Sequence, residues 1–162
     1  MVILLTGLSG AGKSTLALAC RAERVISFIL DGDEVREGLC SDLGFSMEDR
    51  SENLRRVIHC ARLIAMNHVD VFVPVIAPYK KDRAWARHIC KDVGFIEVFV
   101  DCPLETCEKR DPKGLYKKVR LGEISNFTGV DDPFEAPLRP DVYLDTSEMS
   151  VEACVKLILV AL

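Results

Sequence analysis

The sequence has no long hydrophobic run and no recognisable secretion signal. Its apolar stretches, such as Val69 to Ala77, are interrupted by charged residues or proline and fall well short of the ~20 residues that a membrane span needs. The first residues, Met1 to Thr6, lack a basic region and run directly into Gly7, which argues against a signal peptide. We therefore expect a cytoplasmic protein that does not bind membranes.

The sequence also lacks paired cysteines. Its seven cysteines are scattered, and no two form a C-x-x-C pair. A zinc site or a disulfide framework needs tighter spacing. We expect reduced, mostly buried thiols in a reducing compartment.

There is no excess of positive charge. The net charge of −4 argues against bulk nucleic-acid binding, which needs a basic surface. One segment departs from this balance, because Lys109 to Arg120 holds six basic residues and a single acidic one, Asp111. Such a local patch indicates an anionic small ligand.

The remaining composition is that of one folded domain over residues 1–162, with 49% hydrophobic and 28% charged residues. Strand-like and helix-like segments alternate, which predicts an α/β fold with a mostly parallel central sheet. The expected strands are Val2 to Thr6, Val25 to Leu30, Val69 to Val75, Phe95 to Val100 and Val142 to Leu144. The expected helices are Lys13 to Arg24, one beginning near Ser46, Asp82 to Asp92, Pro103 to Arg110 and Val151 to Ala161.

The strongest motif follows the first strand and matches G-x-x-x-x-G-K-[ST]. Its glycines let backbone N–H groups point at phosphate oxygens, next to a helix N-terminus. Lys13 is the predicted catalytic lysine at the β- and γ-phosphates of ATP, and the Ser14 hydroxyl is the predicted Mg²⁺ ligand. The predicted ATP-binding residues are Gly7, Leu8, Ser9, Gly10, Ala11, Gly12, Lys13, Ser14 and Thr15. The motif makes the expected fold a P-loop NTPase-type three-layer sandwich.

Asp31-Gly32-Asp33 ends the second strand, where ligands of open parallel sheets bind. A carboxylate there can approach Mg²⁺ through water or accept the proton of an attacking hydroxyl. Both carboxylates could instead cap the next segment. We favour Asp33 as the base or metal-side carboxylate, with Arg36 holding it ionised.

A polar helix face carries Asp49, Asn53 and Arg56, with Arg50 beside Asn53. It lies opposite the apolar stripe of the same helix, so we expect it to face outward. It is either a solvated, self-paired face or a site where Arg50 grips a phosphate or sulfate and Asn53 fixes a base or sugar.

Residues 111–139 show no clear periodicity and are rich in glycine and proline, which is typical of a functional lid. A cationic, glycine-hinged lid suits a polyphosphate, although a solvated basic loop would look the same. Phe127 is unexpected as a core residue in a polar loop. Stacking on a purine would give it a role, as it would for Phe45.

Several motifs together closely resemble the adenylylsulfate (APS) kinase family. They are the phosphate loop, Asp31 to Arg36, Leu43 to Arg56, Phe99 to Leu104, Arg110 to Tyr116, Asn126 to Gly129 and Glu135 to Pro137. The resemblance implies transfer of the ATP γ-phosphoryl group to the 3′-hydroxyl of APS, giving PAPS in sulfate assimilation, by a homodimer.

The resemblance also implies an acceptor site in which Phe45 and Phe127 sandwich the adenine of APS. The implied APS-binding residues are Asp33, Arg36, Phe45, Arg50, Asn53, Ile76, Ala77, Lys113, Leu115, Phe127 and Gly129. The sequence departs from the family at Ala77, where a serine is frequent, and at Lys80, where an arginine is frequent. A kinase for another small acceptor and a non-catalytic nucleotide-binding module are the alternatives.

Overall fold

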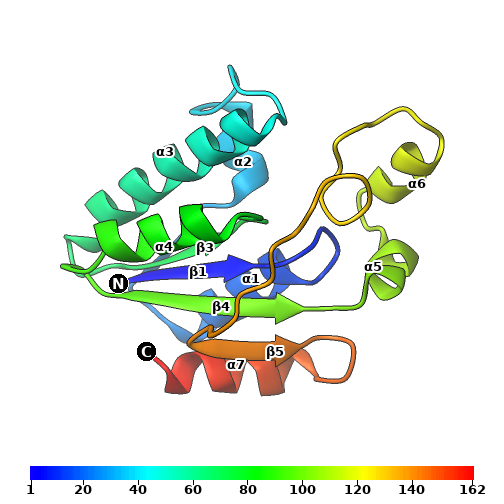
Figure 1. The fold of residues 1–162 in the computed structure, drawn as a ribbon. Helices are drawn as coiled ribbons and strands as arrows, with labels where there is room; N and C mark the ends of the chain where they lie inside the picture. The colour runs from blue at the N-terminus through cyan, green and yellow to red at the C-terminus, as the bar shows by residue number, and fades with distance from the viewer.

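The computed structural model describes residues 1–162 and forms a three-layer α/β sandwich (Figure 1). Its central sheet has five parallel strands in the order β2-β3-β1-β4-β5. The strands are β1 (Val2–Thr6), β2 (Ser27–Ile29), β3 (Asp70–Pro74), β4 (Phe95–Asp101) and β5 (Val142–Asp145). The parallel sheet and its five strands are confirmed, but β2 is shorter than expected because Val25 and Ile26 lie exposed beside it.

Helices cover both faces of this sheet. They are α1 (Lys13–Glu23), α2 (Gly32–Glu37), α3 (Met47–Ala65), α4 (Lys80–Ile89), α5 (Leu104–Arg110), α6 (Leu115–Arg120) and α7 (Val151–Val160). Helices α3 and α4 lie on one face, and α1 and α7 on the other (Figure 1). None of these helices has both the length and the apolar character required to cross a membrane.

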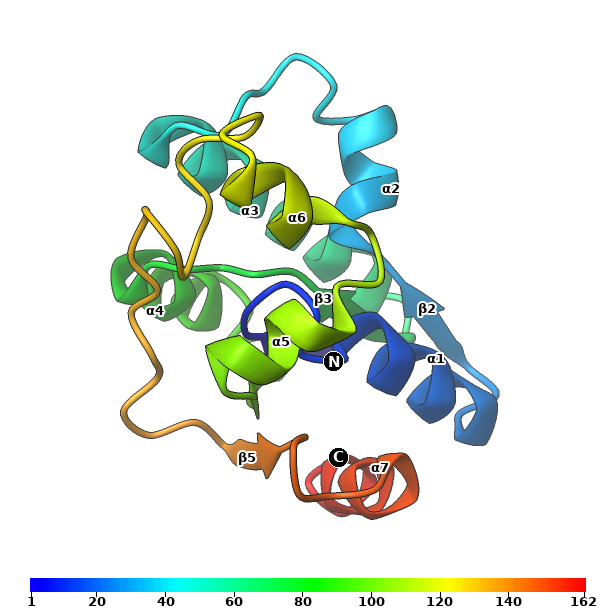
Figure 2. The ribbon, with the colours of Figure 1, turned by 90° about the vertical axis from the view of Figure 1, so that its right-hand side faces the viewer.

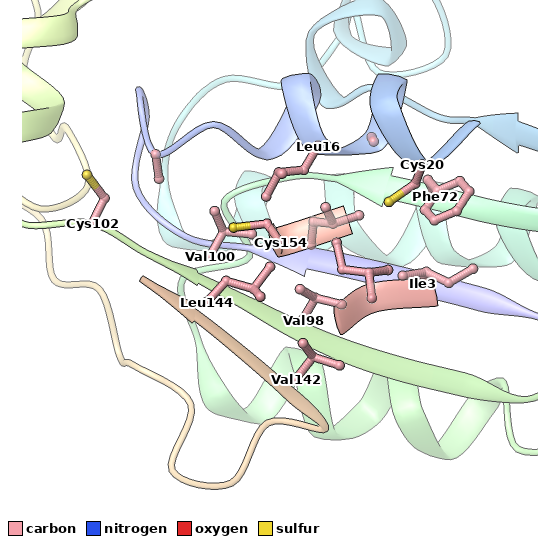
Figure 3. Close-up of a cluster of buried hydrophobic side chains, with 14 of the residues drawn as sticks. Ile3, Leu16, Cys20, Phe72, Val98, Val100, Cys102, Val142, Leu144 and Cys154 are labelled. Atoms are coloured by element: carbon pink, nitrogen blue, oxygen red, sulfur yellow. The ribbon is translucent and has the colours of Figure 1, made fainter. Parts of the chain in front are cut away.

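The sequence of β1 explains the two cores. All five of its residues are fully buried. Ile3 and Leu5 pack into the core beneath α1 and α7, and Figure 3 shows this core with Leu16 of α1. Val2 and Leu4 pack into the second core, beneath α3 and α4. A strand buried on both faces needs a continuous apolar run rather than an alternating pattern, and β1 has one.

The sequence analysis missed the short helices α2 and α6, each of six residues. Helix α6 corrects the expectation that residues 111–139 are irregular throughout. One or two turns are too short to show a hydrophobic period, and local polar contacts define this helix instead. The Asp111 carboxylate accepts hydrogen bonds from the amides of Tyr116 and Lys117, at 3.2 and 3.1 Å.

The helix expected from Ser46 forms as α3. The Ser46 hydroxyl accepts the Asp49 amide at 3.1 Å and caps the helix, as its spacing predicts. Its apolar stripe, Leu54, Val57, Ile58 and Ala61, is buried.

The cysteines are free, and all are buried except the half-buried Cys60. Burial raises the pKa of the Cys20 and Cys90 thiols to about 11, which keeps them protonated near neutral pH. The buried thiols are therefore part of the core, as expected.

Candidate nucleotide and acceptor site

The arrowheads of β1, β4 and β5 lie on the side of the molecule where α5 and α6 are found (Figure 1), and Figure 2 shows the molecule from that side. A cavity of about 700 Å³ lies there, within the size range of small-molecule sites. The phosphate loop, α2, the start of α3, the loop after β3 and parts of residues 110–128 line it. The fold thus brings together segments that are more than a hundred residues apart in sequence.

At one end of the cavity, the phosphate loop leads into α1. The Lys13 ammonium donates to the Leu8 carbonyl at 2.6 Å. Burial lowers the pKa of Lys13 to about 8 in this arrangement. The loop is also tied to α6, because the Tyr116 hydroxyl donates to the Ser9 carbonyl at 2.9 Å. A bound triphosphate would stabilise the charged form of this lysine, so the loop favours an anionic ligand.

Asp31 and Asp33 differ in their contacts. One oxygen of Asp31 accepts the Ser14 hydroxyl at 2.6 Å, and the other accepts the Asp33 amide at 2.9 Å. Asp31 therefore caps α2, the alternative left open for these carboxylates, and also lies at the helix that follows the phosphate loop. Asp33 forms an ion pair with Lys113.

Arg36 does not pair with Asp33, so the partner expected for Asp33 is corrected to Lys113. The Arg36 guanidinium donates instead to the carbonyls of Leu43 and Gly44, at 3.3 and 3.0 Å. It also lies 4.5 Å from the centre of the Phe45 ring. Burial and, next, the positive charge of Arg50 lower the pKa of Arg36. Two guanidinium groups this close make a positive region that suits an anionic ligand.

The polar face of α3 does not face outward throughout, contrary to expectation. The Arg50 side chain is 9% exposed and Asn53 is 7% exposed, and both line the cavity. Only Arg56 has the expected outward ion pairs, with Asp42 and Glu52. The reason is tertiary, because Arg50 donates to the Asn126 carbonyl of the lid at 2.6 Å, a contact that the helical period alone cannot reveal.

Two buried polar atoms have no hydrogen-bond partner within the protein: Nδ2 of Asn53 and Oγ1 of Thr128. Both residues line the cavity. Buried polar groups are nearly always satisfied. A bound ligand would supply the missing partners.

Phe45 and Phe127 both line the cavity. Phe45 is 60% exposed, whereas Phe127 is 9% exposed. Phe127 belongs to a hydrophobic core and meets Tyr116 edge-on, with ring centres 5.0 Å apart. It is therefore a core residue as well as a wall of the cavity, which corrects the expectation that it is out of place as one.

Ile76 and Ala77 lie in the loop after β3, and their backbone is fixed from both sides. Thr6 of β1 donates to the Ile76 carbonyl at 2.6 Å, and Arg83 of α4 donates to the Ala77 carbonyl at 2.7 Å. Arg83 is 3% exposed and also binds Glu97 and the Glu135 carbonyl. It links this loop to the trailing part of the lid. No pattern in the sequence distinguishes it from a surface arginine.

Most residues predicted for the site line this one cavity. They are Ser9, Gly10, Ala11, Gly12, Lys13, Ser14, Thr15, Asp33, Arg36, Phe45, Arg50, Asn53, Ile76, Ala77, Lys113, Leu115 and Phe127. Gly7, Leu8 and Gly129 do not line it. A Cβ on Gly7 would meet the Val100 carbonyl oxygen at 2.2 Å, and one on Gly129 would meet the Leu8 side chain at 2.7 Å. These two glycines allow close packing beside the cavity.

A further wall of the cavity is not predicted by the sequence motifs, although its Arg110 belongs to the basic segment Lys109 to Arg120. It includes Arg110, Thr146 and Met149, beyond the phosphate loop. Arg110 donates to the Thr146 carbonyl at 2.6 Å and holds this wall together. Thr146 directly follows β5, so its place at the carboxyl end of a parallel strand was the available signal.

Comparison with known proteins shows the family of this chain. The family model for adenylylsulphate kinase matches residues 1–145. The adenylyl-sulfate kinase of Marinobacter nauticus is 53% identical over 154 residues, which cover 93% of this chain and 77% of the relative. That of Pseudomonas aeruginosa is 48% identical, covering 98% of this chain and 83% of the relative.

A solved structure gives the same result in three dimensions. The APS kinase CysC of Mycobacterium tuberculosis, in complex with AMPPNP and APS, is 47% identical and superimposes with a TM-score of 0.94. The match covers 99% of this chain and 95% of that one. The chain belongs to the adenylyl-sulfate kinase family.

Proposed function

We propose that the protein transfers the γ-phosphoryl group of ATP to the 3′-hydroxyl of APS, giving PAPS and ADP. One observation carries the proposal: a single cavity is lined both by the phosphate loop and by two aromatic residues, Phe45 and Phe127. A kinase whose acceptor is itself an adenine nucleotide needs such a second purine site. Residues 1–162 would act as one domain, with residues 111–139 as its lid.

In the nucleotide half, Gly7 to Thr15 would bind the triphosphate of ATP through backbone amides and Lys13. The adenosine of ATP would lie against the wall of Arg110, Thr146 and Met149. Mg²⁺ fits the Ser14 hydroxyl with the Asp31 carboxylate beside it, because Mg²⁺ prefers oxygen ligands and completes its shell with phosphates and water. It would supply positive charge at the phosphates.

In the acceptor half, Phe45 and Phe127 would sandwich the purine of APS. Asn53 offers its unpaired amide donor to the base or sugar. Arg36 and Arg50 would provide positive charge for the phosphosulfate. Ile76, Ala77 and Leu115 would complete the walls, and Gly129 would shape the turn behind Phe127.

For the chemical step, Asp33 would accept the proton of the 3′-hydroxyl. The hydroxyl oxygen bonds to the γ-phosphorus, the bond from that phosphorus to the bridging oxygen breaks, and ADP leaves. Lys113 now pairs with Asp33, so acceptor binding must separate them or let the hydroxyl enter beside them. Freed Lys113 would face the transferred group, with the lid excluding water.

The test is turnover of the purified protein with Mg-ATP and, separately, APS, adenosine or shikimate in a coupled ADP assay. We expect turnover with APS that far exceeds that with the other two. Preference for adenosine or shikimate would favour another small-molecule kinase. ATP binding without turnover on any acceptor would favour a non-catalytic module.

The family resemblance also supports a cytoplasmic homodimer. The expected mass in solution is twice the monomer mass, measured by light scattering after size exclusion. A monomer at micromolar concentration would contradict the dimer without affecting the proposed reaction.

A further inference from the structure

Phe127 lies in a turn that belongs to no helix or strand, so the position of its ring depends on contacts within that turn. In this turn, which covers residues 126–131, Asn126 has a left-handed backbone with φ of 56°. Non-glycine residues adopt this conformation at a cost, so neighbouring contacts must stabilise it. The contacts that do so involve Asp131, which no comparison or motif singles out.

The Asp131 carboxylate binds two consecutive backbone amides. Its Oδ2 accepts the Asn126 amide at 2.8 Å, and its Oδ1 accepts the Phe127 amide at 2.5 Å. The Phe127 carbonyl closes the turn by accepting the Val130 amide at 3.0 Å. The pKa of Asp131 is lowered, chiefly by the amide of Phe127, so the carboxylate stays charged at neutral pH.

The peptide group between Asn126 and Phe127 is held from both ends. Asp131 accepts its N–H, and Nη2 of Arg50 donates to its carbonyl oxygen at 2.6 Å. The same arginine donates through Nε to the Phe45 carbonyl at 2.9 Å. A chain of charge-assisted hydrogen bonds thus runs from Asp131 through one peptide and Arg50 to the second aromatic wall.

We propose that Asp131 is a positioning residue for the acceptor's purine: it fixes the peptide that carries Phe127 and, through Arg50, the spacing of Phe127 from Phe45. It touches no reacting atom, and its effect reaches the substrate only through these groups. The inference rests on the proposed acceptor site.

The Asp131→Asn variant tests this with little change in size. An amide side chain keeps one acceptor oxygen but presents an NH2 group to the other backbone amide. One of the two hydrogen bonds that Asp131 accepts is therefore lost. We expect KM for APS to rise on the order of tenfold, the effect of one weakened charge-assisted hydrogen bond. KM for ATP should stay within about twofold, because Asp131 makes no contact with the phosphate loop.

Glu123→Gln is the matched control, since Glu123 is an exposed lid acid and its loss removes the same charge. It should leave both KM values unchanged. Adenosine, used as a competitive inhibitor against APS, probes the purine walls without the phosphosulfate. Its inhibition constant should rise in Asp131→Asn by about the same factor as KM for APS.

Two results would overturn the inference: an unchanged KM for APS, or a parallel loss for both substrates together with a lower melting temperature, which indicates a purely structural role. Wild-type protein that does not turn over APS would contradict the proposed function instead. In that case calorimetric binding of adenosine to wild type and Asp131→Asn, with the phosphate-loop half saturated by AMPPNP and Mg²⁺, still decides the inference, because equal affinities would refute it.

Discussion

Lys13 gives the site a pH dependence whose sign follows from the structure. Burial lowers the pKa of this lysine to about 8 in the ligand-free protein. A bound triphosphate favours the charged ammonium and moves the pKa back up. ATP binding must therefore take up a proton wherever the free enzyme is partly deprotonated, and affinity must fall as the pH rises through 8.

The magnitude follows from the same value. With a pKa of about 8, roughly nine-tenths of the free enzyme carries the charged lysine at pH 7 and roughly one-tenth at pH 9. If only the charged form binds, affinity falls about tenfold between these two values. At pH 8, each binding event should take up about half a proton.

Isothermal titration with the non-hydrolysable analogue AMPPNP and Mg²⁺, in two buffers of different ionisation enthalpy, measures both quantities. Lys13→Arg is the control, because arginine does not titrate in this range and should remove the proton uptake. Equal affinity at pH 7 and pH 9 with no proton uptake in the wild type would refute the reasoning.

Three further substitutions test other parts of the site. Asp33→Asn should lower kcat by ~10²–10⁴ while AMPPNP binding measured by calorimetry stays unchanged, as loss of a general base predicts, and a kcat within threefold of wild type would exclude that role. Phe127→Ala should weaken APS binding by roughly 1–3 kcal/mol through lost stacking and leave ATP binding alone, and unchanged APS affinity would make it a packing residue only. Arg83→Ala should lower the free energy of unfolding, measured in urea, by about 1–3 kcal/mol, because it removes the hydrogen bonds to two carbonyls and leaves Glu97 with only the longer contact to Arg87, at 3.6 Å; a loss below about 0.5 kcal/mol would contradict that.

Much of the fold could be predicted from local patterns. The apolar run of β1 and the stripe of α3 each follow from burial against a neighbour, and Ser46 marks its helix by a cap that acts within one turn. The two six-residue helices could not be predicted, because each depends on one local carboxylate: Asp31 caps α2, and Asp111 accepts two amides of α6. Their residues carry no period to detect.

The site divides along a similar line. Lys13 and Ser14 could be placed because the phosphate loop is one continuous segment whose chemistry depends on its spacing. The ion-pair partner of Asp33 could not be predicted, because Lys113 lies 80 residues away in the sequence. The nearer arginine, Arg36, donates to two backbone carbonyls and lies against the Phe45 ring instead. Pairing between distant segments is set by packing, which no short motif encodes.

The central claim is that one cavity holds ATP at the phosphate loop and an adenine nucleotide at the aromatic walls. The most direct measurement is the product formed from Mg-ATP and APS, identified by mass and by the position of the new phosphate in ³¹P–¹H NMR. We predict that the products are ADP and a nucleotide phosphorylated at the 3′-hydroxyl of APS. Phosphate found on another atom, or ATP consumed with APS left intact, would contradict it.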